Sequence, residues 1–188
     1  AQGSPGAGGA ESSDRSSHFS RTGCHRTVRA MGYVTSLFAR KMIAAAGAEV
    51  DARALLASVG LDADGAWDPQ VMLSDTVYYD LLERMAAQMD VTALPVKVGA
   101  SMRCDEYGAL GLAWKAAPDL NGSLARVARY ARLWTSVVGY SLRPENRGVL
   151  YAVERDGPRR LGLRLSNETT LAATVALARQ VSPEPVVP

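Results

Sequence analysis

The segment from Gly108 to Trp134 constrains the fold of this chain more than any other part of its sequence. It contains two apolar stretches of helical character that meet at Pro118. The proline ends the first stretch, because its ring forces the residue before it out of the helical region. Asp119 or Asn121 then stands where a side chain caps a second helix. The segment therefore predicts a packed helical hairpin, an element that can form the wall of an apolar pocket.

Three further helices are predicted upstream of this hairpin. The first ends near Gly47, where glycine suits a helix C-terminus, and a second covers residues 52–59 after an acidic cap. The third begins at Ser74, a good N-cap, and its apolar residues recur at helical spacing: Tyr78, Leu81, Leu82, Met85 and Met89. Residues 93–102 are compatible either with a strand or with a short helix.

The hydrophobic period changes from helical to alternating after Trp134. Alternation at residues 137–142, 149–154 and 161–165 predicts three consecutive strands, and the short turns between them predict antiparallel neighbours. A last helix is predicted from Asn167. The expected class is α+β, in which N-terminal helices and the helical hairpin pack on an antiparallel β-meander, with a further helix after the sheet.

The two ends of the chain differ from the middle. Residues 1–30 are rich in Ser and Gly and carry scattered arginines, which predicts a disordered extension; a basic arm or a targeting peptide is the alternative. Residues 31–181 are expected to form one folded domain. Residues 182–188 contain three prolines and cannot continue a helix.

Charge and cysteine content exclude several classes of protein. The chain has 21 basic and 19 acidic residues, so that its net charge of +2 predicts no strong attraction to nucleic acid or to anionic membranes. Its apolar runs are too interrupted to span a bilayer. Cys24 and Cys104 lie far apart and do not suggest a disulfide scaffold, which favours a reducing cytoplasm.

A search for catalytic or metal-binding groups finds little. The only histidines, His18 and His25, fall in the N-terminal extension, so neither a general base nor a zinc ligand is expected in the folded part. Cys104 is interpreted as a buried, inert thiol. Asp105 and Glu106 suit the start of a helix better than an acid–base pair. The sequence also lacks a glycine-rich phosphate loop, so we expect no enzyme, no cofactor and no metal.

Three arginines, Arg126, Arg129 and Arg132, lie three residues apart on the predicted second helix of the hairpin. They form either a phosphate-binding ridge or, as we favour, a solvated helix face.

Four aromatic residues are the strongest candidates for a binding site: Tyr107, Trp114, Tyr130 and Trp134. Tyr130 and Trp134 are one helical turn apart, and a hairpin brings Trp114 towards them. Tyrosine and tryptophan add a polar group to an apolar wall, as small-molecule pockets require. The alternative is that the four rings only fill the core.

Several segments together resemble a known family: residues 108–113, Pro118-Asp119-Leu120, residues 128–133, and upstream residues 54–61. From about Thr35 to Gln180 the chain resembles the N-terminal sensor domain, often called "arabinose-binding", of AraC-type bacterial transcription regulators. The resemblance is to the branch that includes ornithine-utilisation regulators.

This resemblance implies that residues 31–181 form an effector-binding or dimerisation domain, incomplete at its C-terminal side. It also implies sensing of a small-molecule effector, a homodimer, and control of transcription through a C-terminal pair of helix–turn–helix motifs. No such motif is evident in this sequence, so DNA is expected to be a partner only through a domain outside it, and no membrane partner is expected. The identity of the effector does not follow from the family label. The alternatives are a ligand-free dimerisation module and, least favoured, a small enzyme.

Overall fold

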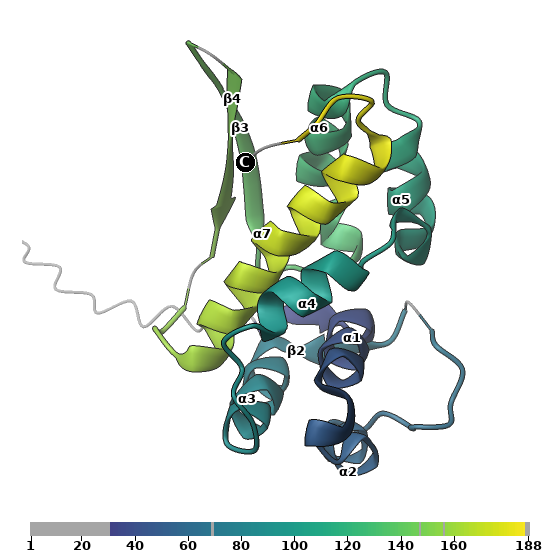
Figure 1. The fold of residues 1–188 in the computed structure, drawn as a ribbon, viewed down its shortest axis with the longest axis vertical. Coiled ribbons are helices and arrows are strands. Elements are labelled where there is room, and N and C mark those ends of the chain that lie inside the picture. The colour runs from purple at the N-terminus through teal and green to yellow at the C-terminus, as the bar shows by residue number, and fades with distance from the viewer. Residues whose placement is uncertain (1–30, 69, 147, 156, 187–188) are drawn as a thin grey trace, which may run out of the picture. The chain divides into compact units, whose positions relative to one another are not determined.

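The structure is a computed structural model that describes residues 31–188 except 69, 147, 156, 187 and 188 (Figure 1). The predictions for the extension, including those for His18, His25 and Cys24, concern residues outside this part. The elements in chain order are β1 (Tyr33–Thr35), α1 (Ser36–Ala46), η1 (Gly47–Glu49), α2 (Ala52–Ser58), β2 (Met72–Ser74), α3 (Asp75–Ala86), α4 (Leu94–Ser101), η2 (Cys104–Tyr107), α5 (Gly108–Lys115), α6 (Leu120–Tyr130), η3 (Ala131–Leu133), β3 (Gly139–Glu145), β4 (Gly148–Glu154) and α7 (Leu161–Val181).

Helix α7 runs through the middle of the fold, with α4 and α3 packed against it (Figure 1). Its buried residues recur every three or four positions and form one stripe: Gly162, Leu165, Ser166, Thr169, Ala173 and Leu177. At the crossing with α4, a Cβ on Gly99 would lie 2.4 Å from the Cβ of Ala172. The two backbones therefore approach as closely as they do because residue 99 has no side chain.

The prediction of a third strand at residues 161–165 and of a helix start at Asn167 is wrong. Helix α7 already begins at Leu161, and Asn167 lies inside it. The alternating leucines suggested a strand, yet only Leu165 is fully buried, while Leu161 is 36% exposed. The sheet is thus a two-stranded hairpin and not a meander, with β3 and β4 paired from Gly139–Glu154 to Glu145–Gly148.

A second small sheet, which was not predicted, joins the N-terminal strand to two distant segments. Strand β1 pairs antiparallel with β2. On its other side, the amide of Thr35 donates to the Trp134 carbonyl at 2.8 Å and the amide of Ser136 donates to the Tyr33 carbonyl at 2.9 Å. Strands of three residues carry too short an alternating pattern to be recognised from sequence.

The upstream helices agree with the sequence-based expectations. Helix α1 ends at Ala46 and is capped by Gly47, which has a positive φ of 61°, and Ser74 caps α3 by accepting from the Val77 amide. The ambiguous residues 93–102 contain helix α4, whose first turn includes Pro95. Proline is accepted there because the first-turn amides have no partner within the helix.

The predicted helical hairpin is present as α5 and α6. Asp119 caps α6 by accepting from the Gly122 amide at 2.7 Å, and the buried Ser123 hydroxyl donates to the Trp114 carbonyl at 2.9 Å. Helix α6 packs against β3 as well as against α5. With helices and small antiparallel sheets combined in this way, the α+β class is confirmed.

Candidate functional site

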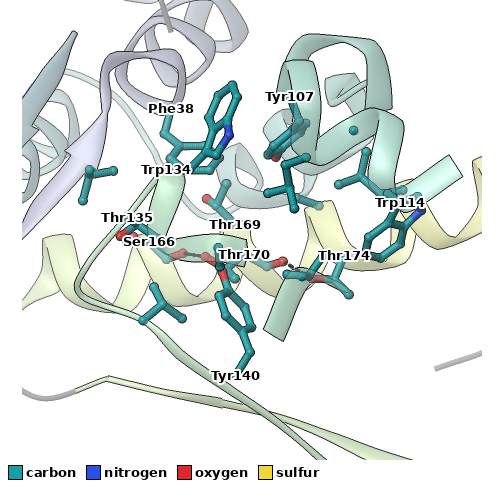
Figure 2. A pocket seen from close by; sticks show the side chains of 18 of the residues that line it. Phe38, Tyr107, Trp114, Trp134, Thr135, Tyr140, Ser166, Thr169, Thr170 and Thr174 are labelled. Carbon is teal, nitrogen blue, oxygen red and sulfur yellow. Dashed lines mark hydrogen bonds between the residues drawn. The ribbon is translucent and has the colours of Figure 1, made fainter. Parts of the chain in front are cut away.

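The helical hairpin, the β3–β4 hairpin, α7 and the N-terminal residues enclose a pocket with a volume of about 60 Å³ (Figure 2). Because one water molecule needs about 10–15 Å³ of such space, the pocket has room for about four to six waters, or for a small organic molecule. The residues that line it are mostly apolar: Val34, Phe38, Tyr78, Cys104, Tyr107, Leu110, Gly111, Trp114, Val127, Ala131, Trp134, Thr135, Val138, Tyr140, Arg155, Ser166, Thr169, Thr170, Ala173, Thr174 and Leu177.

One side of the pocket consists of three aromatic rings in contact. The ring centroids of Tyr107 and Trp134 are 5.1 Å apart, and those of Phe38 and Tyr107 are 6.2 Å apart. Trp67, from the loop before β2, stacks on Trp134 at 6.3 Å but does not line the pocket. Rings at these separations and tilts attract one another beyond their burial, so this side is held in place before any ligand arrives.

The opposite side carries hydroxyl groups from α7, as Figure 2 shows. Three threonine hydroxyls donate to carbonyls one turn earlier in the helix: Thr169 to Leu165 at 2.8 Å, Thr170 to Ser166 at 2.9 Å and Thr174 to Thr170 at 2.9 Å. A hydroxyl has one donor and two lone pairs. These hydroxyls can therefore also accept hydrogen bonds through their lone pairs.

A single charged residue, Arg155, lies among the described residues that line the pocket. Its Nη2 donates to the Thr170 hydroxyl at 2.8 Å and its Nη1 to the Tyr79 hydroxyl at 3.4 Å. Burial raises the pKa of Tyr78 and of Tyr140, and the nearby positive charge of Arg155 partly offsets that rise. The guanidinium thus acts electrostatically on two phenols that line the pocket.

Three of the four aromatic residues predicted as a site come together here. Tyr107, Trp114 and Trp134 line the pocket and are 8%, 3% and 6% exposed. Tyr130 is not a lining residue and is 42% exposed. The reason is that α6 ends at Tyr130 and tightens into the 3₁₀ turn η3, so the regular helical spacing that would align Tyr130 with Trp134 is lost.

Sequence reasoning missed Phe38, Arg155 and the α7 hydroxyls. The hydroxyl stripe had a recognisable signal, since Ser166, Thr169, Thr170 and Thr174 recur at helical spacing. It was overlooked because a strand was expected just before it. Phe38 and Arg155 had no local signal, since their position in the pocket depends on long-range packing.

The groups considered for catalysis are otherwise engaged. Glu106 forms an ion pair with Lys41 and accepts from the Arg103 amide at 2.9 Å, while Asp105 pairs with Lys115. Cys104 is 1% exposed, and burial raises the pKa of its thiol. These contacts show structural ion pairs and a buried thiol rather than an acid–base pair.

The three-arginine ridge is divided in the structure. Arg126 donates from Nη1 to the Ala113 carbonyl at 2.5 Å, close to the end of α5. Arg129 and Arg132 are exposed. Arg126 therefore holds the two helices of the hairpin together, and only two of the three residues lie on a solvated surface.

Among the described residues, no group of His, Cys, Asp or Glu side chains is arranged to hold a metal ion. Within the same part of the chain, no helix has the length and apolar character needed to cross a membrane.

Comparison with known proteins identifies the family. No curated protein matches the chain. Residues 50–188, well over half of the chain, match the family described as "Arabinose-binding domain of AraC transcription regulator, N-term", which is a family of regulatory sensor domains and not of enzymes. The chain therefore belongs to the family of N-terminal arabinose-binding domains of AraC transcription regulators.

Proposed function

We propose that this chain senses a small-molecule effector in the pocket between the helical hairpin and α7, and that the occupied pocket controls the DNA-binding domain of an AraC-type regulator. The observation that carries the proposal is the pocket itself, which combines a pre-packed aromatic side with a hydroxyl-bearing side. Small-molecule sites have this composition, with an apolar lining and a few polar groups that orient the ligand.

Tyr107, Trp114 and Trp134 are the aromatic residues that we assign to effector contact. Each lines the pocket from a different element or turn. A ligand that contacts all three side chains stabilises the arrangement in which these elements lie close together around the pocket. Binding then shifts the population between two arrangements of the regulator. It can do so because the ligand binds one arrangement more tightly than the other.

The test is a thermal-shift screen of the 188-residue chain against amino acids, carboxylic acids, amides and sugars. A ligand present at one hundred times its Kd stabilises the folded state by about 2.7 kcal/mol. We expect Trp134→Ala to abolish the shift produced by any ligand found. Val127→Phe is expected to do the same by filling the pocket from a half-buried lining position.

Trp67→Ala is the matched control, because Trp67 stacks on Trp134 from outside the pocket. It should leave ligand affinity within about twofold of the original. Unchanged affinity in both Trp134→Ala and Val127→Phe would refute the pocket assignment. If Trp134→Ala is too unstable to measure, the Val127→Phe result decides alone.

A second candidate function is a dimerisation module that needs no ligand. It is favoured by two large exposed apolar side chains at the end of α6 and in η3, Tyr130 at 42% and Leu133 at 58% exposure. Light scattering with and without a ligand separates the two functions. A dimer that Leu133→Glu dissociates, in a protein that binds no small molecule, would favour the second.

A further inference from the structure

Two buried donors among the residues that line the pocket have no hydrogen-bond partner among the described residues. They are the Nε of Arg155 and the Nε1 of Trp114. Buried donors in native proteins are nearly always satisfied, so their partner is expected from whatever occupies the site.

Arg155 is also a cation without a matching anion among the described residues. Its two hydrogen-bond acceptors there, Tyr79 and Thr170, are neutral hydroxyls, although a guanidinium offers five donors. Arg155 is half-buried and its Nε is fully buried, and a charge that is partly withdrawn from water without a counter-charge is costly. The cost is recovered when an anion enters the site.

Carboxylates on the elements that surround Arg155 form ion pairs with other arginines. Glu154, the neighbour of Arg155 in sequence, bonds Arg143 at 3.2 Å across the β-hairpin. Asp80 and Glu83 of α3 bond Arg160 at 2.5 and 2.6 Å. These ion pairs leave Arg155 as the cation that faces the pocket.

We infer that the effector is a small carboxylic acid with an apolar or aromatic body, whose carboxylate binds Arg155 beside Thr170 and whose body packs on Tyr107 and Trp134. This inference rests on the proposed function, since it names the chemical class of the ligand for the same pocket. In Figure 2, Thr170 lies on one side of the pocket, and Tyr107 and Trp134 lie on the other. A charged end and an apolar end therefore have separate places to bind.

The volume sets the size of the acid. Space for about four to six waters corresponds to a ligand of roughly five to ten non-hydrogen atoms. Sugars and other neutral polyols are disfavoured, because the lining has many apolar side chains and its threonine donors already bond the helix backbone.

The test compares acids with their amides, which have nearly the same shape but no charge. The probes are benzoate, phenylacetate and hexanoate against benzamide, phenylacetamide and hexanamide, titrated calorimetrically into the 188-residue chain at pH 7. We expect at least one acid to bind about tenfold or more tightly than its amide, because a charge-assisted contact to the half-buried guanidinium is lost in the amide.

Arg155→Gln should bring the acid and the amide within about twofold of each other by weakening the acid, and Arg155→Lys should keep part of the preference. Arg143→Gln is the matched control, because Arg143 lies on the same hairpin but outside the pocket lining. It should leave the preference unchanged. If Arg155→Gln does not fold, the acid–amide comparison in the unaltered protein and the Arg155→Lys variant still decide.

Each other result contradicts the inference. Equal affinity for acid and amide would overturn it while leaving the pocket as a sensor of neutral ligands. A preference that survives Arg155→Gln would place the charge recognition elsewhere. If none of the six probes binds, the carboxylate class is wrong, and the wider screen with Trp134→Ala and Val127→Phe decides separately whether the pocket senses anything.

Discussion

The side chain of Glu83 secures the start of α7 although it belongs to α3. Its Oε1 accepts from the Gly162 amide at 2.9 Å and from Arg160 Nε at 2.7 Å. The first amides of a helix lack partners within the helix, and here a carboxylate from another element supplies one. Hydrogen bonds from Arg160 and from the Gly162 amide lower the pKa of Glu83 to about 2.

We expect Glu83→Gln to destabilise the protein at pH 7 by about 1 kcal/mol, a value kept small because the Glu83 side chain is 32% exposed. Since the pKa is lower in the folded state than its ordinary 4.5, the stabilisation is complete above about pH 5 and is lost as the pH falls towards about 2. Urea unfolding of both proteins at pH 7, 5 and 3 should show the difference shrinking with acid.

Glu168→Gln is the control for this experiment, because Glu168 forms only a partly exposed ion pair with Arg164. It should change the free energy of unfolding by less than about 0.5 kcal/mol at each pH. A Glu83→Gln effect that is constant from pH 7 to pH 3 would contradict the ionic role of Glu83.

At the scale of elements, the contact between α4 and α7 depends on Gly99. A Cβ there would lie 2.6 Å from the backbone carbon of Ala172 and 2.8 Å from the Ala173 nitrogen, so a larger residue has to separate the two helices. We expect Gly99→Val to lower the free energy of unfolding by about 1–3 kcal/mol. Ala100→Val, at an exposed position of the same helix, should cost about 0.5 kcal/mol, and equal losses in urea unfolding would disprove the close-packing argument.

The elements also show which structures local sequence can predict. The hairpin of α5 and α6 was predictable because its proline, its Asp119 cap and its apolar spacing lie within one continuous segment. The start of α7 was not, because its N-cap residue Arg160 makes no side-chain capping bond and the signal comes from Glu83 instead. The three pocket aromatics lie in or beside that same continuous segment, so its local pattern predicted them. Arg155 lies in the pocket through long-range packing, which no local pattern predicts.

At the scale of the whole molecule, the fold extends beyond the segment that matches the family. That match begins at residue 50, yet β1 and α1 precede it and contribute Val34 and Phe38 to the pocket. They also supply a large share of the core, with these residues buried: Leu37, Ala39, Met42, Ile43 and Ala46. The N-terminal strand and helix are thus part of the same folded unit as the matched segment.

We therefore expect a chain that begins at Val50 to lose cooperative unfolding. Removing β1 and α1 exposes the side of α4 and α3 that they cover, and leaves residues 134–136 without their strand partner. A chain that begins at Met31 is the control and should unfold in a single transition. The measurement is circular dichroism during urea unfolding, and a cooperative transition in the shorter chain would show that the matched segment suffices.

Because α7 is long and is held at one end, a small tilt of the helix displaces its other end. Its 21 residues span about 32 Å as one uninterrupted rod. The rod is fastened at the Arg160 end by carboxylates of α3, and its middle turns form one side of the pocket. The displacement grows with distance from the fixed end, so a tilt of the helix by about 2° moves Val181 by about 1 Å.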